Sequence, residues 1–172
     1  MGIHKLLNKG FIILDGATGT NLQKQGMASG DCPELWILGH KEVFLELQKG
    51  YIQSGCDILF APTFTCNAVK LNEYGVKDRQ EELTKDLISL SKQAVLESDR
   101  KKPVYIAGDL SMTGEQLTPM GQMTFEELVD IYKEQVRYCV DGGVDLFVIE
   151  TMMSLQESRA ALLAVKETCR LP

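Results

Sequence analysis

The chain has 172 residues, of which 44% are hydrophobic and 24% are charged, as is typical of one globular domain rather than a disordered protein. Lys and Arg total 18 against 24 Asp and Glu, and the resulting net charge of −6 argues against nucleic acid or an anionic membrane as a partner. No apolar run approaches the ~20 residues of a membrane span, and residues 1–10 lack the apolar stretch of a secretory signal. We therefore expect a cytoplasmic protein.

Five scattered cysteines and two distant histidines offer no pattern of metal ligands. No cysteine pair has the C-x-x-C spacing of a zinc knuckle or a redox motif. We expect the thiols to act as small buried hydrophobic groups. The cysteines are Cys32, Cys56, Cys66, Cys139 and Cys169.

Four continuous apolar runs predict the strands of a parallel sheet. They are residues 11–14, 58–61, 104–107 and 146–149. Continuous rather than alternating apolar runs are typical of strands that are covered on both faces. Apolar residues at helical spacing predict one helix through Leu83 and Ala94 and another through Phe125 and Val140.

Short motifs mark the ends of these helices. Thr124 with Glu127, and Ser154 with Glu157, have the spacing of a capping box. Gly55 follows one predicted helix, where a left-handed residue commonly ends it.

A faint internal repeat joins two helix-to-strand junctions. The Gly-x-Asp sequence of residues 55–57 recurs at residues 143–145, each time just before an apolar run. Gly142 and Gly143 would end the preceding helix in the second copy. Extra segments interrupt the repeating pattern after residues 11–14 and around residues 67–75.

Alternating strands and helices allow either an open doubly wound sheet or a barrel. The turn after residues 11–14 is Asp15-Gly16-Ala17-Thr18-Gly19-Thr20, which is neither a dinucleotide fingerprint nor a Walker loop. A TIM (β/α)8 barrel typically needs ~250 residues. Four strand–helix units therefore predict that residues 1–172 form a single partial domain, the amino-terminal half of such an α/β barrel. A half-barrel leaves two open sheet edges and one uncovered inner face, so we expect the chain to dimerise, to bind a missing half or to be a piece of something longer.

Two carboxylates mark the candidate site, because barrels place their active sites at the carboxyl ends of the strands. Asp15 and Glu150 each close an apolar run, where a buried carboxylate is costly without a cation or a hydrogen-bond donor. The ammonium group of a substrate would satisfy both, and the backbone amides of Gly16 to Thr20 would suit its carboxylate. The pattern predicts a site for the zwitterionic end of an amino acid. Asp15 capping its own turn and Glu150 pairing with Lys or Arg are the structural alternatives.

These motifs resemble the homocysteine S-methyltransferase family, most strongly the amino-terminal homocysteine-binding modules of cobalamin-dependent methionine synthases. The resemblance extends from about Phe11 to the last residue. It is carried by residues 14–20, 33–35, 63–64 and 149–152. It implies a barrel methyltransferase that methylates the sulfur of homocysteine in methionine biosynthesis. By position, Asp15 and Glu150 would hold the amino group and the amides of Ala17 to Thr20 the carboxylate. Thr63 would belong to the same substrate site.

The resemblance also implies a zinc ion that binds the homocysteine sulfur, because a free thiol of pKa ~8.5 is mostly protonated at neutral pH. The family's zinc ligands are three cysteines after the sixth and eighth strands, beyond the four units present. We therefore expect no metal ligand and no catalytic residue in this chain, and no activity from it alone. A corrinoid methyl carrier is the expected partner, with betaine and S-methylmethionine as alternative methyl donors.

Two departures from the family pattern concern substrate contacts. Pro62-Thr63-Phe64 replaces the common Asn-Thr-Phe, and Ser111-Met112 stands where Gly-Pro often follows the third strand. Two other functions stay open. A stand-alone half-barrel could serve as a binding or assembly module without catalysis. A different barrel enzyme could use Asp15 and Glu150 as an acid/base pair on a sugar, although a single Trp offers few aromatic platforms.

Overall fold

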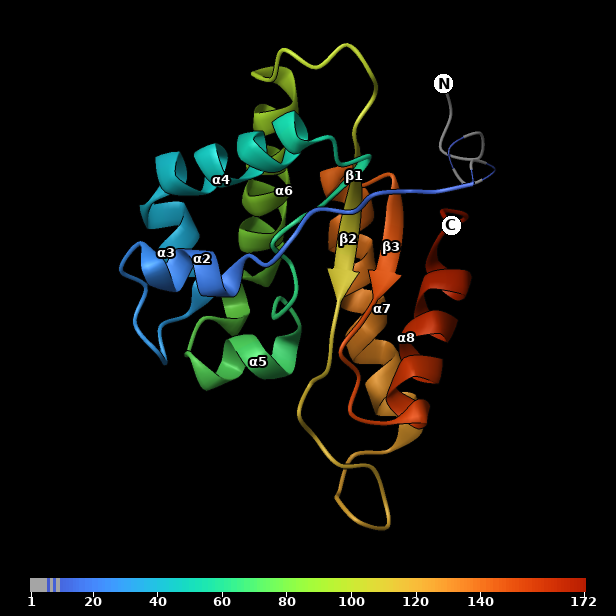
Figure 1. Cartoon of the computed structure of the whole chain (residues 1–172). Coiled ribbons are helices and arrows are strands. Elements are labelled where there is room, and N and C mark those ends of the chain that lie inside the picture. Colours follow the sequence, from blue (N-terminus) through green and yellow to red (C-terminus); the bar gives the residue numbers. More distant parts are fainter. Residues whose placement is uncertain (1–5, 7, 9) are drawn as a thin grey trace.

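A computed structural model describes residues 6, 8 and 10–172. Most of the segment for which we predicted no secretory signal therefore lies outside the described residues. Within the described part, three parallel strands form one sheet in the order β1-β2-β3 (Figure 1). The strands are β1 (Ile58–Phe60), β2 (Tyr105–Leu110) and β3 (Leu146–Ile149).

Helices precede and follow the strands in the alternation that the sequence predicts. They are α2 (Gly19–Lys24), α3 (Pro33–Gly39), α4 (Lys41–Ser54), α5 (Ala68–Glu73), the 3-10 helix η1 (Lys77–Arg79), α6 (Gln80–Leu96), α7 (Phe125–Gly142) and α8 (Leu155–Thr168). The long helices α4, α6, α7 and α8 pack in chain order, each against the next (Figure 1). The predicted α/β class with a parallel sheet is confirmed. No helix in the described part is long and apolar enough to cross a membrane.

The two faces of the sheet pack against different layers. Side chains such as Ile106 and Phe147 pack among the helices, together with Ile88 of α6 and Cys139 of α7. The opposite face carries a separate cluster that includes Ile58, Ala107 and Leu146, and Leu6 from the amino-terminal segment packs there. The helices therefore cover one face, whereas the other carries this smaller cluster, in which Phe60, Tyr105 and Val148 are only partly buried.

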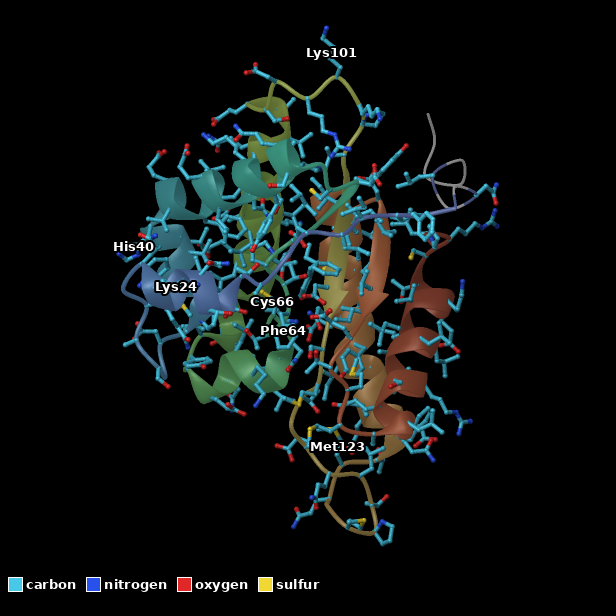
Figure 2. The ribbon with its side chains drawn as sticks, in the orientation of Figure 1. Lys24, His40, Phe64, Cys66, Lys101 and Met123 are labelled. Carbon is cyan, nitrogen blue, oxygen red and sulfur yellow. The ribbon has the colours of Figure 1, made fainter. Side chains whose placement is uncertain are left out.

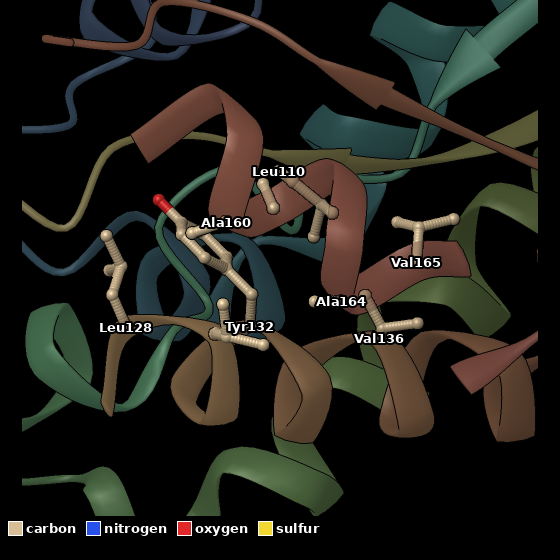
Figure 3. Packing of buried hydrophobic residues seen from close by; sticks show 9 residues of the cluster. Leu110, Leu128, Tyr132, Val136, Ala160, Ala164 and Val165 are labelled. Atoms are coloured by element: carbon tan, nitrogen blue, oxygen red, sulfur yellow. The ribbon is translucent and has the colours of Figure 1, made fainter. Parts of the chain in front are cut away.

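Helices α7 and α8 form the largest core cluster through small and large side chains that interlock. Figure 3 shows Tyr132 and Val136 of α7 facing Ala160 and Ala164 of α8. The small alanines let the two helices approach closely, and the fully buried Tyr132 ring fills the space between them.

The first predicted strand is wrong in extent. Residues 11–14 run parallel to β1 but form only one isolated bridge, between Leu14 and Ile58. The side chains of Phe11 and Ile13 are 91% and 57% exposed, so no packed layer holds this segment in a regular ladder. The third predicted strand is longer than expected, because β2 continues beyond Ala107 to Leu110.

The Gly-x-Asp repeat has one structural role at both junctions. The backbone N–H of Asp57 donates to the carbonyl of Ile13 (2.6 Å), and its carboxylate accepts from the N–H of Ile13 (3.2 Å). Asp145 does the same with the carbonyl and the N–H of Ile106, both at 2.8 Å. Each aspartate therefore joins the start of its strand to the preceding one. Gly55 precedes the first of these junctions.

The helix ends confirm most of the predicted caps. Thr124 and Glu127 form a complete capping box at the start of α7. Ser154 caps α8 by accepting from the N–H of Glu157, but the Glu157 carboxylate turns inward instead of completing the box. Gly55, with φ 105°, and Gly143, with φ 80°, end α4 and α7 in the left-handed conformation that favours glycine. Gly142 is the last helical residue of α7.

Candidate functional site

A cavity of about 690 Å³ lies at the carboxyl end of the sheet. Ala61 after β1, Asp109 in β2 and Glu150 after β3 line it, together with the whole turn from Asp15 to Thr20. Phe64, another lining residue, is seen near the carboxyl ends of the strands in Figure 2, whereas Lys101 lies at their opposite end. The structure thus brings Asp15, the glycine turn and Glu150 together, as predicted.

Asp15 is fixed by hydrogen bonds to β1 through its backbone and through one of its two carboxylate oxygens. Its backbone N–H donates to the carbonyl of Ile58 (3.0 Å), and its Oδ2 accepts from the N–H of Phe60 (3.1 Å). The other carboxylate oxygen, Oδ1, is buried and has no hydrogen-bond partner among the described residues. A buried oxygen without a donor is destabilising, so this position favours a ligand that donates.

Asp109 adds a further carboxylate, beside Asp15 and Glu150, that the sequence-based site does not include. Its side chain belongs to a residue only 5% exposed, and its Oδ1 also lacks a partner. Its backbone is fixed by the hydroxyl of Thr63, which accepts from the N–H of Asp109 (2.9 Å) and donates to its carbonyl (3.0 Å). The strand therefore holds Asp109 firmly while its carboxylate faces the cavity.

Glu150 lies directly after β3, where its N–H donates to the carbonyl of Leu110 (3.0 Å). The next residue, Thr151, has a φ of 52°, which is rare for a β-branched side chain. Such a conformation costs free energy and is common at functional sites. It turns the chain sharply just after the carboxylate that faces the cavity.

The three carboxylates lie together without a protein cation. Within the described part of the chain, none of them forms an ion pair with Lys, Arg or His, so the predicted alternative of a cation paired with Glu150 is not observed. Burial, with the nearby charge of Glu150, raises the pKa of Asp15 to about 7. Burial, with the charges of Glu150 and Asp15, raises the pKa of Asp109 to about 8. A positive ligand would relieve this repulsion.

The glycine turn presents backbone amides to the same cavity. Asn21 Nδ2 and the Tyr51 hydroxyl both donate to the carbonyl of Ala17, at 2.6 and 2.8 Å. A side chain at Gly16 would come within 2.9 Å of the Tyr51 ring, so glycine is required for this close approach. The N–H groups of Gly16, Ala17 and Thr18 donate to no acceptor in the described part. They are available to an anion.

Comparison with known proteins agrees with this geometry. Residues 12–172 match the family model for homocysteine S-methyltransferase. The chain belongs to the homocysteine S-methyltransferase family. It is 28% identical over 167 residues to methionine synthase from Mycobacterium tuberculosis, covering 92% of this chain but 14% of that protein.

Solved structures of the homocysteine methyltransferase MmuM from Escherichia coli share the fold. The metallated form has a TM-score of 0.77 and 21% identity, and the match covers 98% of this chain and 64% of that one. The apo form has a TM-score of 0.71 and 20% identity, with 96% and 59% covered. This chain therefore spans less than two thirds of these relatives.

Thr63 is placed differently from the prediction that the family resemblance implied. It is fully buried, lies outside the cavity lining, and its hydroxyl serves the backbone of Asp109. Gln135 Nε2 of α7 in turn donates to the carbonyl of Thr63 (2.8 Å). Thr63 thus fixes the backbone of a cavity-lining residue. Its neighbours Pro62 and Phe64 line the cavity.

Glu34 is a further lining residue that the sequence-based site missed. It is 1% exposed, and its carboxylate accepts from the Thr65 hydroxyl and from Cys32 Sγ (3.3 Å). Pro33-Glu34 belongs to the motif that carries the family resemblance, which was the available signal. Its hydrogen bonds join α3 to the segment after β1 across the wall of the cavity.

The cysteines do not form a metal site in the described part of the chain. All are free thiols, and no group of three His, Cys, Asp or Glu residues there has an arrangement that could hold a metal ion. Burial raises the pKa of Cys32 to about 11 and that of Cys139 to about 12, so both stay protonated. The donors in this chain do not fit the three-thiolate zinc site that the resemblance implied.

Proposed function

We propose that this chain is the amino-terminal half of a (β/α)8 homocysteine S-methyltransferase domain and supplies the amino-acid-binding half of its site. The parallel strands in chain order and the successive packing of α4, α6, α7 and α8 support a barrel segment. The match to the family model and the shared fold with the Escherichia coli methyltransferase support the enzyme class. The chain's share of that relative, 64%, supports a partial domain.

One observation carries the substrate assignment: buried carboxylate oxygens and backbone amides that find no partner in the described part of the chain line the same cavity. The ammonium group of homocysteine would be held by Asp15 and Glu150. Its carboxylate would accept from the amides of Gly16, Ala17 and Thr18 and lie beside Gly19 and Thr20. Positive and negative ends of the amino acid would thus each meet the complementary charge or dipole.

In this proposal the chain binds and orients homocysteine, and the chemical step belongs to the rest of the domain. The ammonium and carboxylate contacts fix the Cα of the substrate, so its thiol extends away from the carboxylates. The residues that activate the sulfur lie outside this chain. Zinc as the metal of the complete domain and a corrinoid methyl carrier as its partner remain proposals that rest on the family resemblance.

An activity and metal-binding assay tests the division of labour. Purified residues 1–172, supplied with zinc and methylcobalamin, betaine or S-methylmethionine, should neither retain stoichiometric zinc nor form methionine from homocysteine. The same chain should nevertheless bind L-homocysteine in saturation-transfer NMR, because the groups that hold the amino acid are present. Stoichiometric zinc together with unaided methylation would contradict the proposal.

A further inference from the structure

The cavity contains a cluster of three carboxylates that no cationic side chain in the described part of the chain neutralises. Asp15 follows the segment that runs beside β1, Asp109 lies in β2 and Glu150 follows β3, and all three line one cavity. The Oδ1 atoms of both aspartates are buried without any hydrogen-bond donor. Asp109 is the most buried of the three, at 5% exposed. Three full negative charges in this setting would repel strongly, because screening by water is weak there.

The groups that surround the aspartates offer no compensating charge. The negative charge of Asp15 acts on the Tyr51 hydroxyl of α4 and on the Cys56 thiol that precedes β1. The charge of Asp109 acts on the Cys139 thiol of α7, which packs near Gly108 on the other face of the strand, and Thr63 holds the backbone of Asp109. Burial raises the pKa of Cys56 to about 11 and that of Cys139 to about 12, so these thiols are neutral. Among the described residues, no Lys, Arg or His pairs with either aspartate.

We propose that Asp109 is a third ligand of the bound ammonium group, and that the empty site holds one proton, chiefly on Asp109, which is released when the cation binds. A primary ammonium group has three N–H donors, one for each carboxylate. One positive charge enters as the ammonium and one leaves as the proton, so the total charge of the occupied site equals that of the empty one. The identity of the cation rests on the proposed function, whereas the proton of the empty site does not.

Proton release makes binding depend on pH in a defined direction. Below the Asp109 pKa of about 8, the cation must displace the proton, so affinity should rise with pH. The expected increase approaches tenfold per pH unit between about pH 7 and pH 8, as for exchange of one proton. A carboxylate pair with ordinary pKa values would give no change in this range.

The proton of the empty site is tested by following a pH titration of the 172-residue chain by NMR, with 13C labels at the aspartate carboxyl carbons. The signals of Asp15 and Asp109 should both titrate near neutral pH or above, and Asp109→Asn should remove the one with the higher midpoint. Asp130→Asn is the matched control, because Asp130 lies on α7 with its side chain 78% exposed. Glu150→Gln should lower the midpoint by removing a nearby negative charge. If no aspartate titrates above pH 6, the inference is wrong.

Proton release is tested by calorimetry with L-methionine, which has the amino acid head group but no thiol. Titrations in buffers of different ionisation enthalpy at about pH 7 should show close to one proton released per molecule bound, and much less in Asp109→Asn. Binding without release would overturn the inference. If L-methionine does not bind but the aspartate still titrates near neutral pH, the proposed function and the release of a proton on binding are both overturned. The proton of the empty site is then still supported.

Discussion

Single residues decide whether this cavity binds a cation, and the sequence reveals some of them more readily than others. Asp15 and Glu150 are recognisable because each ends an apolar run, where a carboxylate is conspicuous. Asp109 is less recognisable, because Gly108 separates it from the apolar run that ends at Ala107, whereas pairing with β3 extends β2 to Leu110. The substrate-binding role expected for Thr63 stays a prediction, since no sequence pattern shows on which side of a loop a hydroxyl points.

The raised carboxylate pKa values predict how stability changes with pH. Asp15 and Asp109 have folded-state pKa values of about 7 and about 8, above the ordinary aspartate value of 3.8. Their contribution therefore favours folding fully below about pH 4 and is lost as pH rises through those values. The free energy of unfolding should fall by roughly 2–4 kcal/mol between about pH 5 and pH 9.

Urea denaturation of the ligand-free chain at several pH values measures this change. Asp109→Asn should flatten the profile, because asparagine does not ionise. Asp130→Asn should leave the profile unaltered. An unfolding free energy that rises over the same range would show that the buried carboxylates are compensated in a way the structure does not contain.

A buried hydroxyl on α7 provides a second test at the residue scale. Tyr132 Oη lies 2.9 Å from the carbonyl of Ser111 and 3.1 Å from Glu157 Oε1. Tyr132→Phe should lower the free energy of unfolding by about 1–3 kcal/mol, because buried acceptors lose a donor. Tyr138→Phe, on the same helix and partly exposed, should change it by no more than about 0.5 kcal/mol. Equal effects in thermal or urea denaturation would contradict a structural role for the buried hydroxyl.

At the level of elements, periodicity and caps predicted the long helices well. The apolar face of residues 83–94 belongs to α6, and that of residues 125–140 belongs to α7, because both faces are buried against neighbouring helices. Residues 11–14 were less predictable. A regular strand needs a packed partner on its faces as well as apolar residues, and Phe11 and Ile13 have none.

Asp57 and Asp145, the aspartates of the Gly-x-Asp repeat, should contribute more to the stability of the sheet than their exposure suggests. Asp145→Ala removes the acceptor for the N–H of Ile106, so we expect a loss of about 1–2 kcal/mol in unfolding free energy. Asp141→Ala, in the last turn of α7, is the control and should have little effect, because its carboxylate makes only a long ion pair with Lys85 (3.7 Å). Chemical denaturation of both variants measures the difference. Similar losses would remove the structural explanation of the repeat.

At the scale of the whole molecule, the sheet has apolar and hydrogen-bonding groups at its margins. Phe11 and Ile13 are exposed beside β1, and at the other margin the N–H of Phe147 donates to the carbonyl of Pro172 (2.9 Å). A homodimer through these edges, expected from the sequence, remains a prediction.

Gel filtration of the isolated chain over a range of concentrations tests that prediction. The apparent mass should increase with concentration, because exposed apolar edges favour association. A double change of Phe11→Ser and Ile13→Ser should weaken the association. Leu96→Ser is the matched control, since Leu96 is 84% exposed at the end of α6, away from the sheet margin. A monomer at every concentration would contradict the prediction.

Recognition of an ammonium group by Asp15 and Glu150 is most directly measured by comparing L-homocysteine with 4-mercaptobutyrate, which lacks only the amino group. Calorimetry under reducing conditions should show binding of homocysteine at least about tenfold tighter, equivalent to about 1.4 kcal/mol. Glu150→Gln should reduce this preference, and Glu126→Gln, on the exposed side of α7, should preserve it. Equal affinity for the two compounds, or a preference that Glu150→Gln leaves unchanged, would contradict the assignment of this cavity to an amino acid.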